Sequence, residues 1–253
     1  MSGIFYGVGV GPGDPELLTV KAVRVIESCG VLAVPISDDR LKEPVLISKR
    51  EGAVGEYREF LERCAAYQII RAAGLCLEGK PVLYLPMPMK KERAILDQIH
   101  DRCAEIIGKL LAEGKVVACI TIGDPTVYST CVYMQKRILK LGYETCFIPG
   151  VPSFCAAAAR MNMGLVEGSE ELHVLPASYE IEEGLELPGT KVLMKAGRKL
   201  AYVKEAVRGK GVEIGMVENC GMEGERIYHA AEEIPEKTSY YSLMIVKEGN
   251  NRR

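Results

Sequence analysis

Two short glycine-containing stretches carry the residue types and spacing that best fit a ligand site. They are "GVGVGPGD" at 7–14 and "TIGDPTVYST" at 121–130. Each follows an apolar run typical of a strand, and glycine allows a backbone to turn sharply or to approach a ligand closely. Ligands of open α/β sheets bind at the carboxyl ends of strands, so two such loops predict a shared crevice. A tight turn that only needs glycine backbone freedom would give the same pattern in either stretch taken alone.

The first stretch does not fit the common nucleotide-binding motifs. A dinucleotide fold needs glycine at the third position of G-x-G-x-x-G, and the three possible registers place Pro12, Asp14 or Glu16 there. A phosphate-binding P-loop needs G-x-x-x-x-G-K-[ST], but the first lysine of the chain is Lys21. A nicotinamide-dependent oxidoreductase is therefore the least favoured enzyme class.

Composition limits the partners further. The chain has 253 residues, 48% of them hydrophobic, and a formal net charge of −2. It is long enough to bury a substantial core, and it has no global basic field to attract nucleic acid or an anionic membrane. No apolar run approaches the roughly 20 residues of a membrane span, and the first residues do not resemble a secretory signal. We therefore predict a cytoplasmic protein.

Cysteine and histidine give little support for a metal centre. The chain has nine cysteines, of which the closest two, Cys146 and Cys155, are nine residues apart, and its three histidines are isolated. There is no C-x-x-C or H-E-x-x-H pattern, so we expect no protein-bound metal. Most cysteines lie inside apolar segments and are predicted to be reduced, buried residues that act as small hydrophobes.

Strand-like and helical stretches alternate along the first part of the chain. Strands are expected at 3–10, 31–35, 81–86, 115–122 and 145–149, with helices at 15–28, 64–78 and 90–113 and a further helix from Pro125 to about Gly142. Such alternation indicates an open, mostly parallel α/β sheet. After Pro149 an alanine-rich helix at 153–161 and one near 198–208 accompany five strand-like runs, several without a helix between them. We predict two α/β domains, 1–149 and 150–253, the second with a mixed sheet.

Four motifs in this order and spacing resemble the tetrapyrrole methylases, which use S-adenosylmethionine. They are "GVGVGPGDPELLTVKAVRVI", "ITIGDPTVYST", "IPGVPSFCAAAARMNMGL" and "KVLMKAGR". The resemblance covers essentially the whole chain. It implies two α/β domains with the cofactor folded into the cleft between them and held largely by backbone groups. It also implies S-adenosylhomocysteine as the product and a homodimeric assembly.

Within that family the chain is most similar to enzymes that methylate carbon 20 of precorrin-2 or cobalt-precorrin-2 in cobalamin biosynthesis. The similarity rests on "LPMPM", on "VLMK" followed by "GR", on "GERIY" and on the terminal "SYYSLMIVK". Two alternatives stay open: a methylase that acts at another ring position, such as one of uroporphyrinogen III, and a non-catalytic S-adenosylmethionine-binding protein. Whether the substrate already carries cobalt is also left open.

The resemblance assigns roles residue by residue. It implies cofactor contacts from Pro12, Ile122, Gly123, Asp124, Val127, Tyr128, Pro152, Ser153, Phe154, Met194 and Lys195. Ser153 could instead serve only as a helix N-cap. The tetrapyrrole carries many carboxylates, so cations should line its site; the expected substrate contacts are Arg198, Arg226 and Tyr241. Methyl transfer from a sulfonium depends mainly on positioning, and the sequence selects no catalytic base among Asp124, Tyr128 and Tyr241.

Residues 38–63 depart from the carbon-20 methylases. This segment looks inserted, and 13 of its 26 residues are charged. A high density of charge is typical of a solvated surface element. We therefore expect a solvated helical excursion, with a mobile flap over the substrate as the alternative.

Overall fold

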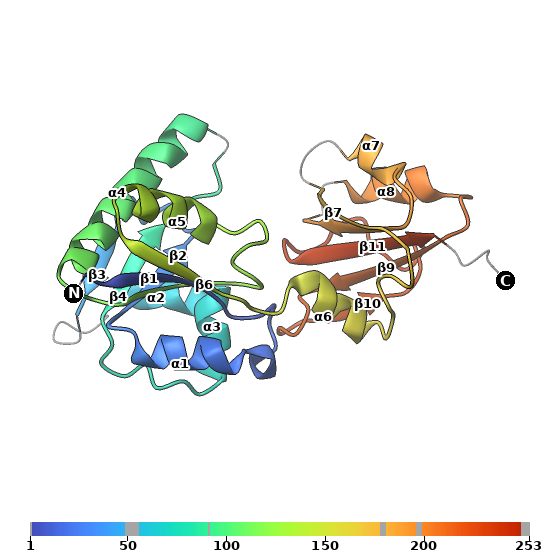
Figure 1. Cartoon of the computed structure of the whole chain (residues 1–253). Coiled ribbons are helices and arrows are strands. Elements are labelled where there is room, and N and C mark those ends of the chain that lie inside the picture. Colours follow the sequence, from blue (N-terminus) through green and yellow to red (C-terminus); the bar gives the residue numbers. More distant parts are fainter. Residues whose placement is uncertain (1, 49–55, 91, 178–180, 196–198, 249–253) are drawn as a thin grey trace. The chain divides into compact units, whose positions relative to one another are not determined.

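A computed structural model describes residues 2–48, 56–90, 92–177, 181–195 and 199–248. The chain divides into two compact units, Met1–Pro152 and Ser153–Arg253 (Figure 1). The sequence placed the division at 149, three residues earlier. Each unit contains its own sheet with helices packed on it, and this agrees with the predicted α/β class.

The sheet of the first unit is almost entirely parallel. Its strands are β1 (Ile4–Gly9), β2 (Val31–Ile36), β3 (Val45–Ile47), β4 (Val82–Pro86), β5 (Val117–Thr121) and β6 (Glu144–Ile148). They are arranged in the order β3-β4-β2-β5-β1-β6. All neighbours run parallel except the short edge strand β3, which pairs antiparallel with β4. The carboxyl ends of the five parallel strands therefore share one edge of the sheet.

Helices cover both faces of this sheet. They are η1 (Pro15–Leu17), α1 (Val20–Ser28), α2 (Glu56–Arg63), α3 (Ala65–Ala72), α4 (Arg93–Ala112) and α5 (Cys131–Lys140). In β2, Leu32 and Val34 pack into the core under α1 and α3, whereas Val31 and Ala33 pack into the core under α4 and α5 (Figure 1). A strand buried on both faces needs apolar residues at every position, which explains the continuous apolar runs in the sequence.

The helix expected over 15–28 is two separate pieces. Asp14 accepts a hydrogen bond from the Glu16 amide (2.9 Å) and caps the short 3-10 helix η1. Thr19 then caps α1, accepting from the Ala22 amide (3.1 Å). Two capping residues in close succession each satisfy orphan amide groups, so the chain restarts its helix after an extended residue at Leu18.

The helix after the second glycine stretch begins later than expected. Residues 122–130 form a loop, and α5 starts at Cys131, not at Pro125. Ser129 accepts a hydrogen bond from the Cys131 amide (3.1 Å) and donates one to the Thr121 hydroxyl (3.0 Å). These buried side chains tie the two ends of the loop together and fix the start of the helix.

The second unit contains the predicted mixed sheet. Its strands are β7 (Leu172–Pro176), β8 (Thr190–Met194), β9 (Val212–Glu218), β10 (Arg226–Tyr228) and β11 (Ser242–Glu248), in the order β10-β9-β11-β8-β7. Only β7 and β8 pair in parallel. Helices α7 (Glu182–Leu185) and α8 (Leu200–Val207) cover one face, and α6 (Ser153–Arg160) covers the other (Figure 1).

The cysteines are thiols, but fewer are buried than the sequence suggested. All nine are free; Cys29, Cys103, Cys119 and Cys131 are buried, whereas Cys76 and Cys155 are exposed. The sulfurs of Cys119 and Cys131 lie 3.6 Å apart in the core under α4 and α5. Burial raises the pKa of Cys103 to about 12, so this thiol stays protonated and behaves as an apolar side chain.

Where the structure describes it, the charged segment 38–63 packs into the core of the first unit and is not a solvated excursion. Its described part contains β3, which extends the sheet, and α2, whose Phe60 is 2% exposed and Leu61 8% exposed. Both side chains belong to the same core as α1 and α3. Composition misled because the charged residues of α2 occupy its solvent side while two apolar residues pack inward. The alternative of a mobile flap is not supported for α2, because a helix with a buried apolar side is held by its packing.

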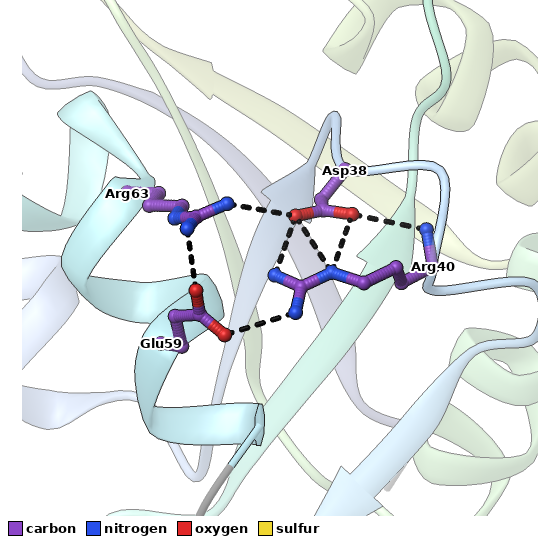
Figure 2. Close-up of polar contacts among 4 residues, drawn as sticks. All are labelled: Asp38, Arg40, Glu59 and Arg63. Carbon is purple, nitrogen blue, oxygen red and sulfur yellow. Dashed lines mark hydrogen bonds and ion pairs between the residues drawn. The ribbon is translucent and has the colours of Figure 1, made fainter.

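Four charged side chains join this helix to the loop after β2 (Figure 2). Arg40 donates to both carboxylate oxygens of Asp38, at 3.0 Å from Nε to Oδ1 and 2.8 Å from Nη2 to Oδ2. Its Nη1 reaches Glu59 of α2 at 2.9 Å, and Arg63 pairs with Glu59 (2.5 Å) and with Asp38 (3.5 Å). The bidentate contact with Arg40 lowers the pKa of Asp38 to about 2.

This network predicts an acid-sensitive contribution to stability. The unfolded pKa of aspartate is about 3.9 and the folded value of Asp38 is about 2, so its stabilising effect is present above about pH 4 and is lost as the pH falls through 2. We expect Asp38→Asn to melt at a lower temperature than the parent protein at pH 6, with the difference shrinking towards pH 2. Melting curves between pH 6 and pH 2 measure this. A difference that stays constant across that range would contradict it.

Candidate functional site

Three loops leave the first sheet at the same edge. Strands β5, β1 and β6 are adjacent and parallel, so the loops that follow them, at 122–130, 10–14 and 149–152, start side by side. Ligands of open parallel sheets bind outside the carboxyl ends of the strands. The edge predicted from the two glycine stretches therefore exists, and it includes a third loop that contains Pro152.

The two glycine stretches are joined through their backbones. The Gly123 amide donates to the Gly11 carbonyl (2.7 Å), and the Gly11 amide donates to the Gly123 carbonyl (3.3 Å). Both glycines have positive φ, 76° for Gly11 and 69° for Gly123. A side chain at either position would be strained, so glycine is required here by conformation.

The loop after β6 packs against this pair without side chains between them. A Cβ atom at Gly150 would lie 2.2 Å from the Gly123 carbonyl oxygen, and a Cβ atom at Gly9 would lie 2.5 Å from the same oxygen. Distances under 3 Å essentially never occur for a real Cβ atom. The three loops can therefore meet only because Gly9 and Gly150 lack side chains.

The sequence-predicted residues of the first unit all lie on these loops. Pro12, Gly123 and Asp124 are buried, whereas Ile122, Val127 and Pro152 are half-buried. Tyr128 differs from them, because its side chain is 52% exposed and its φ is +47°. A large residue held in the left-handed region is a local strain that is common at functional sites.

In the second unit one end of the sheet brings together most of the remaining candidates. Strands β8 and β9 both pair antiparallel with β11, so their carboxyl ends lie at the edge where β11 begins. Lys195 follows β8 directly with φ of +61°, and Asn219 follows β9 directly with φ of +51°. Met194 is the last residue of β8 and is half-buried. Tyr241 immediately precedes β11 and is 41% exposed.

An aromatic pair accompanies the lysine at this end. The Nζ atom of Lys195 lies 5.7 Å from the centroid of the Tyr240 ring, within the range of a cation–π contact. The rings of Tyr240 and Tyr241 are 5.3 Å apart and nearly perpendicular. Because Tyr240 is 48% exposed, the pair presents an aromatic surface and a positive charge together.

Hydrogen bonds hold the segment that carries these tyrosines. The buried carboxylate of Glu218 accepts from the Ser239 amide and from the Tyr228 hydroxyl, the latter at 3.2 Å. The Ser239 hydroxyl donates to the Asn219 side chain (2.9 Å), and the Asn219 amide donates to the Tyr241 carbonyl (2.9 Å). Residues 239–241 are therefore fixed to the end of β9.

The other candidates of this unit lie on α6, at the start of β10 and outside the described residues. Ser153 is the first residue of α6, and Phe154 packs half-buried against the core beneath that helix. Arg226 is exposed and is the first residue of β10, where it pairs with Glu218 at the same end of the sheet as Lys195 and Tyr241. Arg198 lies outside the described residues, so its predicted role stays a prediction.

Sequence reasoning missed Gly9 and Gly150 as loop contacts, and it missed Tyr240. Gly9 stood inside the glycine stretch, and Gly150 stood inside "IPGVPSF", but a glycine gives no signal of what its absent side chain would meet. Tyr240 adjoins Tyr241 in "SYYSLMIVK". Its place beside Lys195 follows from the antiparallel register of β8 and β11, which the sequence does not give.

The described part of the chain contains no cluster of metal ligands and no membrane-spanning helix. Within residues 2–48, 56–90, 92–177, 181–195 and 199–248 there is no group of three or more histidine, cysteine, aspartate or glutamate side chains that could hold a metal ion. Among the helices described, none has both the length and the apolar character needed to cross a membrane.

Comparisons with known proteins agree with this architecture. The model of the tetrapyrrole (corrin/porphyrin) methylases matches residues 5–235. The chain is 34% identical over 248 residues to the "Probable cobalt-precorrin-2 C(20)-methyltransferase" of Methanocaldococcus jannaschii, covering 96% of this chain and 95% of that protein. It is 30% identical over 266 residues to the precorrin-2 C(20)-methyltransferase of a Sinorhizobium species, covering 97% of each.

A solved structure supports the fold independently of close sequence identity. The uroporphyrin-III C-methyltransferase of Thermus thermophilus, complexed with S-adenosylhomocysteine, superimposes with a TM-score of 0.64 at 18% identity over 97% of each chain. The residues that match the family model, 5–235, include both glycine stretches and the end of β8. This chain is a member of the tetrapyrrole methylase family.

Proposed function

We propose that this protein transfers a methyl group from S-adenosylmethionine to carbon 20 of precorrin-2 or cobalt-precorrin-2, a step in cobalamin biosynthesis. The observation that carries the proposal is the 34% identity to a relative named for this activity along almost the whole of both chains. A second relative named for the metal-free substrate is 30% identical over a similar extent. The three-loop edge of the first unit supplies the structural support.

The proposal places cofactor contacts on the loops at 10–14 and 149–152, on the backbone of residues 122–124, and at Val127, Tyr128, Met194 and Lys195. Backbone groups and small side chains dominate these loops, which suits a ligand that is held by main-chain hydrogen bonds. When bound, S-adenosylmethionine supplies an already activated methyl group and leaves as S-adenosylhomocysteine. The protein then has to orient the two reactants, and the close packing of the three loops can hold the cofactor in one orientation.

For the tetrapyrrole we propose contacts from the charged and aromatic residues at the end of β8 and the start of β11. Lys195 carries a positive charge that can pair with a substrate carboxylate, and Tyr240 and Tyr241 offer exposed rings beside it. Arg226 is exposed, as a carboxylate-binding residue should be. Arg198 remains a sequence-based part of this proposal.

Assembly and cellular location are also part of this proposal. The family resemblance supports a homodimer. The cysteine pattern of the sequence, nine residues without C-x-x-C spacing and mostly inside apolar segments, is typical of a reducing compartment and supports a cytoplasmic location.

The test is an anaerobic assay with a carbon-13-labelled methyl donor and with precorrin-2 or cobalt-precorrin-2 as the acceptor. We expect one labelled methyl group per macrocycle, located at carbon 20 by NMR. Both acceptors are needed because the chain resembles relatives named for each form. Uroporphyrinogen III is the control acceptor and should receive little label. Label at a pyrrole carbon, or faster transfer to uroporphyrinogen III, would reassign the protein to another activity in the family.

A further inference from the structure

The buried carboxylate of Asp124 is the side chain that links two of the three loops. Asp124 follows β5 in the second glycine stretch and is 9% exposed. Its Oδ2 atom accepts a hydrogen bond from the Gly150 amide at 3.0 Å, across 26 residues of sequence. Its Oδ1 atom accepts from the Thr126 amide at 2.8 Å and from the Thr126 hydroxyl. Both carboxylate oxygens are therefore engaged, one within the loop and one to the next loop.

The hydrogen bond from the Gly150 amide to Asp124 lies where the backbones of the three loops approach most closely. Gly150 packs against the Gly123 carbonyl, and Gly123 is paired with Gly11. A further contact joins the same loop to α1, because the Thr19 hydroxyl donates to the Pro149 carbonyl at 3.3 Å. Packing of backbone on backbone sets how closely the loops approach, but a directional hydrogen bond is needed to fix their register.

We propose that Asp124 is a positioning residue for the methyl-transfer site: its carboxylate fixes loop 149–152 against loop 122–130 and thereby presets the backbone groups that receive S-adenosylmethionine. This inference rests on the proposed function, which assigns both loops to the cofactor. The role rests on geometry, because the two oxygens of Asp124 accept three hydrogen bonds that join the two loops. A hydrogen bond to an ionised group is stronger than a neutral one, so a carboxylate suits this task.

Three variants separate positioning from the alternatives. Asp124→Ala removes the link to Gly150. Asp124→Asn keeps an acceptor oxygen for the Gly150 amide. Its amino group can donate to the Thr126 hydroxyl, and only the local bond from the Thr126 amide loses its acceptor. Thr126→Val is the matched control, since it deletes only the local hydroxyl contact and leaves the bond from Gly150 intact.

Two measurements need no tetrapyrrole substrate: hydrogen exchange at the Gly150 amide, and the dissociation constant of S-adenosylhomocysteine by calorimetry. For Asp124→Ala we expect Gly150 to exchange at least about tenfold faster and S-adenosylhomocysteine to bind about tenfold more weakly. For Asp124→Asn and Thr126→Val we expect both values to stay within about threefold of the parent protein. The pH profile of methyl transfer should be the same for Asp124→Asn as for the parent.

Several outcomes would overturn the inference. Unchanged Gly150 exchange in Asp124→Ala would mean that the hydrogen bond does not hold the loop. Faster exchange with unchanged S-adenosylhomocysteine binding would mean that the link does not serve the ligand. Loss of activity in Asp124→Asn together with loss of one limb of the pH profile would identify a proton acceptor instead. If Asp124→Ala does not fold, Asp124→Ser takes its place, because its shorter side chain also removes the acceptor for the Gly150 amide, and the same changes in exchange and binding are expected. Absence of methyl transfer by the parent protein would count against the proposed function alone, because exchange and binding are measured without substrate.

Discussion

Replacing Gly150 with alanine is expected to lower kcat/KM for methyl transfer by about a hundredfold, although the added group is a single methyl. The new Cβ atom would lie 2.2 Å from the Gly123 carbonyl oxygen and 2.9 Å from the Gly9 carbonyl carbon. Both neighbours are backbone atoms of central strands or their loops, so neither can rotate away as a side chain would. The loops must separate, and a displacement of about 1 Å at reacting groups can cost about a hundredfold in rate.

Gly30→Ala is the matched control for this substitution. Gly30 follows α1, and its added Cβ atom would lie 3.5 Å from its nearest neighbour, which is an ordinary contact distance. Steady-state kinetics and S-adenosylhomocysteine binding should be nearly unchanged in the control and strongly reduced in Gly150→Ala, while melting curves verify that both variants are folded. A folded Gly150→Ala protein with normal kinetics would show that the close packing of the three loops is not needed for activity.

Phe60→Ala is expected to lower the free energy of unfolding by about 3–5 kcal/mol, the usual cost of truncating a buried phenylalanine. Phe60 is 2% exposed and is the main apolar anchor of α2. Its ring lies 6.0 Å from that of Tyr57, and the Arg40 guanidinium lies 5.2 Å from its centroid. Truncation leaves a cavity under α2 and also removes the surface on which Arg40 rests.

Arg58→Ala tests whether this effect belongs to packing and not to the charge of the segment. Arg58 lies on the same helix with a side chain that is 74% exposed, and its pair with Glu62 is a surface ion pair. Such pairs contribute little, so the control should change the unfolding free energy by less than about 0.5 kcal/mol. Equal, small effects of the two substitutions in chemical denaturation would restore the interpretation of α2 as a solvated excursion.

Part of this fold could be predicted from sequence because the relevant signals are local. The central strands β2 and β5 are buried on both faces, so they appear as continuous apolar runs, and the glycine stretches lie at the ends of β1 and β5. The mixed sheet of the second unit was also predictable, because several strand-like runs follow each other without a helix between them. Helix starts were less accurate: α5 begins six residues after Pro125, since the buried Ser129 and Thr121 side chains hold the preceding loop.

The segment 38–63 could not be predicted from its composition. Its charged residues suggested full exposure, but Arg40 bridges Asp38 and Glu59 of α2 (Figure 2). Phe60 of the same helix belongs to the core. The number of charged residues in a segment reflects the solvent side of an amphipathic helix. It does not reveal whether a few apolar residues on the other side are buried. Which surface those residues meet depends on strands and helices distant in the sequence.

The sequence by itself determined the α/β class, the two glycine loops, their place after strands and the resemblance to one family. Only the tertiary structure decided what individual residues do. Gly9 and Gly150 are needed because each meets the Gly123 carbonyl, and Asp124 has its carboxylate committed to Gly150 and Thr126. A glycine is required where neighbouring atoms leave no room for a Cβ atom, and the role of a carboxylate depends on which donors hydrogen-bond to it. Both depend on partners from other parts of the chain, which spacing along the sequence does not specify.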